Sequence, residues 1–311
     1  MEFLTQYGLF ALKTVTMVLA ILFLVGSILA LKRKSHTDLT ITSLNKEYQS
    51  LMTCMEKEIL GRKSKKKKSK KDSKSVLYVV DFNGDIKASQ VEALRKEISA
   101  ILSIATPKDE VLIRLESPGG TVNGYGLAAA QLQRLRDRDI AITACIDKVA
   151  ASGGYLMACV AHQIIAAPFA MIGSIGVVSQ MPNFHRWLQK NDIDVELLTA
   201  GEYKRTLTVF GKNTPKGRAK FQEDLEVIHE NFRQYVLCNR KDLNIDDVAT
   251  GEHWLATDAQ NLKLVDKLQT SDEFIMDKLE SHQVYHIKSY YKQSFFEKLL
   301  KPAAKLLHPF A

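Results

Sequence analysis

Short apolar runs alternate with amphipathic stretches over the central part of the chain, and this pattern predicts an α/β fold. Strands that alternate with helices at this spacing are typical of a largely parallel sheet. The predicted strands are Val76–Phe82, Val111–Leu115, Ile140–Ile146, Gln163–Ala167, Ile175–Ser179 and Val195–Thr199. The predicted helices are Ser89–Ser103, Gly124–Arg136, a helix that begins at Ser152, and His185–Asn191.

Outside this central part the pattern is mainly helical. Residues 37–61 form a polar segment with helical character, and Pro215–Asn239 is a long amphipathic helix. Asp246–Leu268 holds one or two shorter helices. The last predicted helix, Ser294–Leu307, is basic and amphipathic. We expect it to pack against protein as a partner helix, and the alternative is that it lies on a membrane surface.

The N-terminal region contains the longest apolar run. Thr14–Leu31 comprises 18 residues without a charge, which is close to the length that spans a bilayer core. An uncleaved membrane anchor is favoured over a cleaved signal peptide, because the run is long and no small-residue cleavage site follows it. We therefore predict an anchor with its flanks at residues 1–34, a polar linker at 35–75, a catalytic domain at 76–270 and a helical extension at 271–311.

The charge of the chain is concentrated in one segment. The formal net charge is +8, and residues 62–74 carry nine lysines and arginines with one acid, so this tract accounts for the excess. A block of like charge is typical of a solvated linker, and it is able to contact anionic lipid headgroups. Nucleic-acid binding is not expected, because no aromatic residues interleave with the lysines.

The four cysteines give no sign of a metal site or a disulfide framework. Cys54, Cys145, Cys159 and Cys238 form no CxxC pair and have no metal-ligand spacing with histidine. Cys145 and Cys159 lie in apolar runs, where cysteine behaves as a small buried hydrophobe. No glycine loop for nucleotide phosphates is present either, so neither a metal nor a cofactor is expected.

The candidate chemistry begins at Ser152, which lies in the stretch Ala151-Ser152-Gly153-Gly154-Tyr155 at a strand-to-helix junction. A serine hydroxyl needs a neighbouring base to become a nucleophile. No histidine is obviously placed for this, but Lys204 follows another short apolar run. Lysine acts as a base when burial lowers its pKa far below the usual value of about 10.4. The apolar residues around Lys204 are compatible with such burial, so a Ser–Lys dyad is a candidate.

A second junction carries the glycine-rich turn Ser117-Pro118-Gly119-Gly120. This turn follows a predicted strand and precedes a helix, so its backbone amides are candidates for an oxyanion hole. Gly153, directly after Ser152, is a candidate for a second amide. Each of these signals is weak alone, because glycines also serve turns and close packing.

Taken in order, the motifs resemble those of the S49 peptidases, the signal-peptide peptidase A group, and most closely their SohB branch. The resemblance covers about residues 76–270 and rests on SPGG (117–120), DKVAASGGY (147–155), GSIGV (173–177), AGEYKR (200–205) and the stretch from Trp254 to Asp266. It departs from the family pattern at residues 256–259 and 263–266, in a segment that is structural rather than catalytic.

The resemblance implies a set of roles for residues of this chain. Ser152 would be the nucleophile of a serine endopeptidase, Lys204 the general base, and Ser174 the second serine that orients the lysine. Gly120 and Gly153 would donate the oxyanion amides. The implied fold is the ClpP/crotonase type, a spiral of ββα units. The resemblance also implies a homo-oligomer with catalytic sites at subunit interfaces, polypeptide substrates near the membrane, and a place in a bacterial inner membrane.

Three other interpretations fit the residue types of the catalytic region. A histidine triad would use His162 or His185 with Asp147; His162 lies too far along the helix from Ser152, whereas His185 is not excluded by distance. A crotonase-like acyl-CoA enzyme would use glutamates such as Glu116 and Glu202. A catalytically inert membrane scaffold of the same fold is the third.

The membrane orientation stays open at this stage. Lys32, Arg33 and Lys34 follow the apolar run, so the positive-inside rule places the large C-terminal part in the cytoplasm. The family resemblance implies the opposite side.

Overall fold

The structure is a computed structural model, and it describes residues 6, 8–10, 12–18, 38–61 and 75–290. Residues Thr40–Ser289 form one compact unit, and the two ends of the chain form another. In the terminal unit, the described residues between 6 and 18 are helical. No helix among the described residues is long and apolar enough to cross a membrane. Most of the apolar run 14–31 lies outside the described residues.

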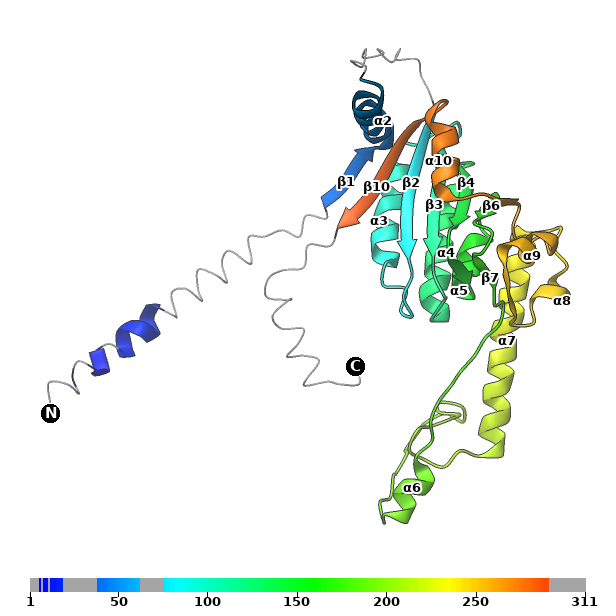
Figure 1. Cartoon of the computed structure of the whole chain (residues 1–311). Helices are drawn as coiled ribbons and strands as arrows, with labels where there is room; N and C mark the ends of the chain where they lie inside the picture. The colour runs from blue at the N-terminus through cyan, green and yellow to red at the C-terminus, as the bar shows by residue number, and fades with distance from the viewer. Residues whose placement is uncertain (1–5, 7, 11, 19–37, 62–74, 291–311) are drawn as a thin grey trace. The chain divides into compact units, whose positions relative to one another are not determined.

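The compact unit is a mixed α/β structure built around a seven-stranded sheet (Figure 1). Five of its strand pairs are parallel: β10 with β2, β2 with β3, β3 with β4, β4 with β6, and β6 with β9. The order across the sheet is β1 (Asp38–Ser43), β10 (Gln283–Tyr290), β2 (Val76–Asn83), β3 (Glu110–Glu116), β4 (Ala141–Ile146), β6 (Gln163–Ala166) and β9 (Lys267–Leu268).

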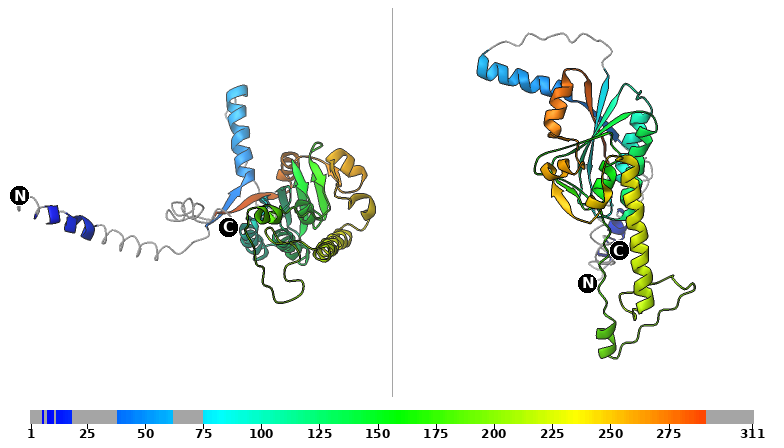
Figure 2. Two further views of the ribbon diagram at one scale, coloured as in Figure 1. Left: turned by 90° about the horizontal axis from the view of Figure 1, so that it is seen from below. Right: turned by 90° about the vertical axis from the view of Figure 1, so that its right-hand side faces the viewer.

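The central strands are buried on both faces, which explains why they read as continuous apolar runs. Leu77 to Val80 of β2 and Val111 to Ile113 of β3 are all buried. One face is covered by α10 (Ser271–Leu279), whose Phe274 and Ile275 join a core cluster with residues of β2, β3, β4, β6 and β10. The opposite face carries α3 (Val91–Leu102) and α4 (Val122–Arg136), as the right-hand view of Figure 2 shows.

A second, smaller sheet lies beyond the ends of the central strands. It contains β5 (Val149–Ala151), β7 (Met171–Gly173) and β8 (His253–Leu255) in that order, with β5 and β7 parallel and β7 and β8 antiparallel. An isolated bridge between Ser117 and Ala150 connects this sheet to the end of β3. The small sheet therefore places the segment after β5 beside the turn after β3.

Several helices complete the unit, and one of them matches its predicted bounds. Thr214 caps α7 (Pro215–Asn239), because its side chain accepts a hydrogen bond from the amide of Gly217 and proline occupies the first turn. The remaining helices are α2 (Leu44–Leu60), α5 (Gly153–Ala158), α6 (His185–Lys190), α8 (Ile245–Val248) and α9 (Ala256–Asn261).

Two predicted strands are wrong. Neither Ile175–Ser179 nor Val195–Thr199 forms a strand, because neither backbone pairs with a strand of the two sheets in the described part of the chain. Both lie in or next to residues 177–214, a segment between β7 and α7 that we call the arm. Figure 1 shows the arm running past the N-terminal end of α7, with α6 at its tip.

Six of the described strands were not predicted, namely β1, β5, β7, β8, β9 and β10. β1 precedes the expected polar helix, α2, and β10 follows α10 in the segment where only helices were expected. The predicted helix Ser294–Leu307 lies outside the described residues.

Candidate active site

Ser152 stands at the junction between β5 and α5 in a strained backbone conformation. Its φ is 51° and its ψ is −117°, a region that residues other than glycine rarely occupy. The amide of Ser152 donates a hydrogen bond of 2.8 Å to the carbonyl oxygen of Gly173. In the described part of the chain its hydroxyl has no hydrogen-bond partner. Backbone hydrogen bonds therefore hold the residue while the hydroxyl stays available.

Ser174 takes up a corresponding position after the neighbouring strand. Ala151 of β5 pairs with Gly173 of β7 in parallel register, so Ser152 and Ser174 directly follow a matched pair. Ser174 also has a positive φ, 52°, and its amide donates to the carbonyl oxygen of Glu252 at 2.6 Å. The structure thus brings these two predicted site residues to the same end of the small sheet.

The glycine turn after β3 lies against Ser152. Gly119 has a φ of +91°, and a Cβ built on it would lie 2.7 Å from the Cβ of Ser152 and 2.9 Å from the amide nitrogen of Gly153. A Cβ on Gly120 would lie only 2.1 Å from the carbonyl oxygen of Ile86. Glycine is required at both positions because the backbone of the turn touches its neighbours directly.

Two backbone amides beside Ser152 have no hydrogen-bond partner within the described residues. One belongs to Gly120 and the other to Gly153. Gly153 is the first residue of α5, where helix geometry provides no acceptor for the amide. The amide of Gly119, by contrast, donates to the Ser117 hydroxyl at 3.1 Å. Gly120 and Gly153 therefore carry the unpaired amides that an oxyanion site needs.

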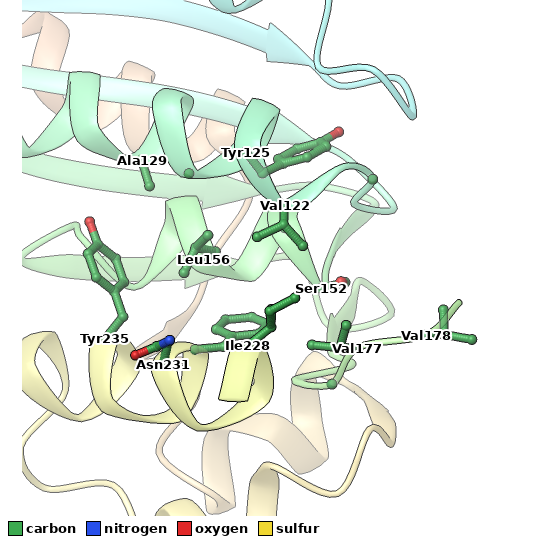
Figure 3. Close-up of a pocket in the computed structure, with 15 residues that line it drawn as sticks. Val122, Tyr125, Ala129, Ser152, Leu156, Val177, Val178, Ile228, Asn231 and Tyr235 are labelled. Carbon is green, nitrogen blue, oxygen red and sulfur yellow. The ribbon is translucent and has the colours of Figure 1, made fainter. Parts of the chain in front are cut away.

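A pocket of about 330 Å³ opens next to Ser152. Figure 3 shows Leu156 between Ser152 and Tyr235, which lies at the opposite end of the pocket. Most of the wall is apolar, and one side comes from α7. The lining residues are Gly120, Val122, Tyr125, Gly126, Ala129, Ser152, Gly153, Leu156, Gly176, Val177, Val178, Ile228, Asn231, Phe232 and Tyr235. The pocket is suited to an apolar side chain of a ligand whose reactive atom lies at Ser152.

Lys204 does not line this pocket. It lies in the arm, where its side chain is exposed and its amide donates to the carbonyl oxygen of Gly201 at 3.2 Å. Within the described residues the Lys204 ammonium has no hydrogen-bond or ion-pair partner. A single chain therefore brings together Ser152, Ser174, Gly120 and Gly153, but it does not place Lys204 among them.

The arm is held by contacts of its own. Phe184 and Phe210 stack with ring centroids 6.3 Å apart, and the side-chain amide of Asn183 donates to the carbonyl oxygens of Thr208 and Gly211. Many of its large apolar side chains are nevertheless exposed, with Leu198 89% and Trp187 62% accessible. An ordered segment with this much exposed apolar surface is typical of a protein–protein contact.

Most side chains of the alternative interpretations have partners away from Ser152. Asp147 accepts hydrogen bonds from the amide and hydroxyl of Ser271 at the start of α10, and Nδ1 of His162 accepts from the amide of Ile142. His185 lies on α6 in the arm. Glu116 pairs with Lys148, and Glu202 pairs with Lys216. None of these residues lines the pocket at Ser152.

The two cysteines that were predicted to be buried are buried in the structure. Cys145 and Cys159 are buried free thiols, and burial raises the pKa of Cys159 to about 12. Such thiols stay protonated at neutral pH and are poor nucleophiles.

Sequence reasoning missed part of the site. Tyr125 of α4 packs directly on Gly153, and the face of α7 that lines the pocket was read only as one side of an amphipathic helix. The apolar positions of that face, Ile228 and Phe232, were a usable signal. The sequence pattern did not reveal which other element these two side chains face across the pocket.

A strained serine with a free hydroxyl beside two unpaired glycine amides is the site geometry of a serine hydrolase. Comparison with known proteins identifies the family. Residues 2–132 match the family described as Peptidase family S49 N-terminal, and residues 134–284 match Peptidase family S49. The chain belongs to peptidase family S49 and is a serine peptidase of the SohB type.

Curated relatives cover nearly the whole chain. The probable protease SohB of Haemophilus influenzae is 47% identical over 329 residues, which include 97% of this chain and 93% of the relative. The putative protease SohB of Buchnera aphidicola subsp. Baizongia pistaciae is 44% identical, over 99% of this chain and 97% of the relative. Among solved structures, a mutant of a membrane-bound stomatin-specific protease in complex with a substrate peptide matches 75% of this chain and 100% of its own, with a TM-score of 0.44 and 15% identity.

Proposed function

We propose that the chain is a membrane-anchored serine endopeptidase that hydrolyses peptide bonds with a Ser–Lys dyad, acting on membrane-associated or signal-peptide-like polypeptides. The observation that carries the proposal is the position of Ser152. Its hydroxyl lacks a partner, and it lies at the mouth of an apolar pocket beside the unpaired amides of Gly120 and Gly153. These are the parts that acyl transfer from a peptide requires.

The proposed reaction has two halves. The hydroxyl oxygen of Ser152 attacks the peptide carbonyl carbon, and its proton passes to the neutral amine of Lys204. The amides of Gly120 and Gly153 stabilise the oxyanion, and the carbon–nitrogen bond breaks as the Lys204 ammonium returns the proton to the leaving amine. Water then gives a proton to Lys204 and attacks the acyl carbon. The Lys204 ammonium returns that proton to the serine oxygen as the ester carbon–oxygen bond breaks, which releases the new carboxyl end and restores Ser152 and the neutral amine.

Lys204 reaches the site from a neighbouring copy in this proposal. Two observations support a homo-oligomer with shared sites. Lys204 is exposed on the arm and has no partner within the described part of its own chain, and the arm also exposes large apolar side chains such as Trp187 and Leu198. Burial of the arm against a second copy would remove this surface from water. It would also desolvate a lysine, which favours the neutral amine that a base needs.

Ser174 is proposed to orient the lysine. It stands beside Ser152 at the end of the paired strand β7, so a lysine that contacts one serine is within reach of the other. A hydrogen bond between the Ser174 hydroxyl and the amine would direct the lone pair toward Ser152.

The pocket indicates the class of substrate side chain. Its volume of about 330 Å³ and its apolar wall suit a large apolar residue on the acyl side of the scissile bond. Apolar segments of membrane-associated polypeptides provide such residues. Polypeptides are accordingly the proposed partners, and no role for nucleic acid or a cofactor is proposed.

The proposed architecture is the ClpP/crotonase spiral of ββα units. A large and a small sheet joined by the bridge between Ser117 and Ala150 support it. The peptidase domain is proposed at residues 76–270, with an anchor at 1–34, a linker at 35–75 and a C-terminal extension at 271–311. The apolar run 14–31 supports the anchor, and the bacterial sources of the relatives support a bacterial inner membrane.

The test uses the full-length chain purified in detergent, with a library of fluorogenic peptides. We expect cleavage after large apolar residues by the wild type, and no cleavage by Ser152→Ala or Lys204→Ala. Lys212→Ala is the matched control, because Lys212 is another exposed lysine of the arm. It should keep wild-type activity.

Mixing the two inactive variants tests whether the dyad is shared. If serine and lysine come from different copies, about one quarter of the sites in an equimolar, randomly assembled mixture are intact. Activity should then return to that fraction of the wild-type value. A mixture that stays inactive contradicts the shared site, and full activity of Lys204→Ala alone contradicts the dyad.

A further inference from the structure

Tyr125 packs against Gly153, which carries one of the two proposed oxyanion amides, and it lines the same pocket as Ser152. It is on α4, and its side chain is fully buried. The ring packs directly on Gly153, since a Cβ built there would lie 2.4 Å from Cγ of Tyr125 and 2.7 Å from its Cβ. Figure 3 shows Tyr125 on the α4 side of the pocket. The tyrosine ring therefore limits how far the Gly153 amide can recede from Ser152.

The hydroxyl of Tyr125 acts on the other amide through Ser117. Oη of Tyr125 lies 2.5 Å from Oγ of Ser117 and donates to the carbonyl oxygen of Asp85 at 2.9 Å. A tyrosine hydroxyl has one proton, so the short contact must use the proton of Ser117. Oγ of Ser117 in turn accepts from the amide of Gly119 at 3.1 Å.

The result is a one-way chain of hydrogen bonds that runs from Gly119 through Ser117 and Tyr125 to Asp85. Every hydroxyl in it donates once and accepts once, which leaves no ambiguity of direction. Burial raises the pKa of Tyr125, so its hydroxyl remains a donor at neutral pH. A chain of this kind holds its members more rigidly than isolated hydrogen bonds do.

The backbone closes tightly around this chain. A Cβ at Gly84 would lie 2.2 Å from Oη of Tyr125 and 2.5 Å from Oγ of Ser117, and the amide of Gly84 donates to the carbonyl oxygen of Glu116. The two hydroxyls therefore have little room to move. Because Ser117 holds Gly119, the following amide, that of Gly120, stays unpaired and fixed in direction.

We infer that Tyr125 is a positioning residue of the oxyanion site, which sets the separation of the Gly120 and Gly153 amides through its hydroxyl on one side and its ring on the other. The inference rests on the proposed function, because it assumes that these two amides bind the oxyanion. It adds a residue from α4 that acts on the reaction through these two amides.

The variant Tyr125→Phe separates the two contributions. It keeps the ring against Gly153 and removes the hydroxyl, so Ser117 loses the acceptor that directs its own hydroxyl and its hold on the Gly119 amide weakens. We expect kcat to fall about 10-fold, because weakening one oxyanion donor costs less than deleting it. KM should stay within about twofold of the wild type, since phenylalanine keeps the ring that lines the pocket. The affinity of a peptide aldehyde, which forms a hemiacetal with Ser152, should fall by the same factor as kcat.

Tyr155→Phe is the matched control. Tyr155 is also fully buried, and its hydroxyl donates to a backbone carbonyl, that of Leu264, at 3.1 Å. Removal of this hydroxyl deletes a comparable buried hydrogen bond but leaves the contacts of the Gly119–Gly120 turn in place. It should lower the thermal unfolding midpoint about as much as Tyr125→Phe does, with no loss of aldehyde affinity.

Ser117→Ala provides a second route to the same answer. If Ser117 and Tyr125 act through one chain, the double variant Ser117→Ala/Tyr125→Phe should be no slower than the slower single variant. Three results would each overturn the inference and leave the proposed function intact. The first is a wild-type kcat in Tyr125→Phe, and the second is a loss of kcat and aldehyde affinity in Tyr155→Phe equal to that in Tyr125→Phe. The third is a double variant whose loss of kcat is the product of the two single losses. A wild-type chain without Ser152-dependent cleavage would overturn the proposed function and the inference with it.

Discussion

Ser152 and Ser174 are structural counterparts, each placed directly after one of two parallel strands that pair Ala151 with Gly173. Both have a φ close to +50°, and both amides donate hydrogen bonds to backbone carbonyl oxygens. The pairing of the strands therefore fixes the separation of the two serines. Any group that contacts the Ser152 hydroxyl from this side also lies near Ser174.

This relationship gives a prediction for Ser174. Ser174→Ala should lower kcat at least 10-fold, because the base would lose the hydroxyl that orients it. Ser174→Gly should lose as much activity, although glycine relieves the backbone strain at this φ. Steady-state kinetics with thermal unfolding as the folding control provide the measurement. Normal activity in the glycine variant would show that only the backbone of Ser174 matters.

A second prediction concerns the glycine turn. Gly119→Ala forces a Cβ toward Ser152 and Gly153 at a φ of +91°, so we expect loss of peptidase activity and a stability loss of about 1–3 kcal/mol. Gly126→Ala is the control for stability. A Cβ at that helical position meets nothing within 4 Å, so stability should rise by about 0.5–1 kcal/mol. Urea unfolding of the two variants would test the contrast, and equal effects would contradict it.

A third prediction follows from Glu97, a carboxyl buried on α3 that accepts a hydrogen bond from the amide of Ser289 at 2.6 Å. Burial raises the pKa of Glu97 from 4.5 to about 7, although that hydrogen bond opposes the change; Asp81, His286 and Lys288 are the other charged groups that act on it. Between these pH values the folded protein keeps a proton that the unfolded chain has lost. The free energy of unfolding should therefore fall by about 3 kcal/mol as the pH rises from 4.5 to 7.

Glu97→Gln tests this directly, because glutamine cannot ionise and still offers an oxygen to Ser289. The variant should be more stable than the wild type at pH 8 and similar to it at pH 5, as measured by chemical denaturation. The neighbouring Asp81 gives the opposite slope at lower pH. Burial disfavours its ionisation, but hydrogen bonds from His286 and Arg114 outweigh this and lower the pKa of Asp81 to about 2. A wild-type slope between pH 5 and 8 in Glu97→Gln would contradict the assignment.

The fourth prediction concerns the arm. Leu198→Asp places a charge on a side chain that is 89% exposed in the single chain, so the folded protomer should tolerate it. If the arm packs against a second copy, the variant should shift the oligomer toward monomers and lose activity in parallel. Met276→Asp is the control, since Met276 is an exposed apolar residue on α10, outside the arm. Light scattering after size exclusion would measure the change, and an intact oligomer of Leu198→Asp would contradict the role of the arm.

The sequence predicted the core of the fold well, because strands buried on both faces leave long apolar runs such as Val76–Phe82. It also predicted α7 at its observed bounds, since Thr214 and Pro215 are strong helix-start signals. Val195–Thr199 was misjudged because apolar composition does not reveal whether a partner strand exists. β10 was missed because its place beside β2 depends on a pairing between distant residues.

In the candidate site, too, residues with a local sequence signal were predicted and residues that depend on distant contacts were not. Ser152 and the turn at Gly119 were found because glycines mark positions where the backbone must bend or approach closely. Tyr125 was not found, because a tyrosine on an amphipathic helix looks like any other core residue until its partners are known. Lys204 was singled out from the motif, and the single chain leaves it apart from Ser152. Its role stays a prediction that subunit mixing can test.

The position of β10 has a consequence for biosynthesis. This strand ends at Tyr290, yet it lies between β1 and β2, the first two strands of the sheet. While a ribosome is still translating the chain, β2 has an open edge and β1 has no sheet to join. A nascent or prematurely terminated chain would thus present an unpaired parallel edge, the kind of surface that chaperones cover and that aggregates form on. The sheet is therefore complete only once β10 has been synthesised, and quality control that acts on unfinished chains has a specific edge to recognise.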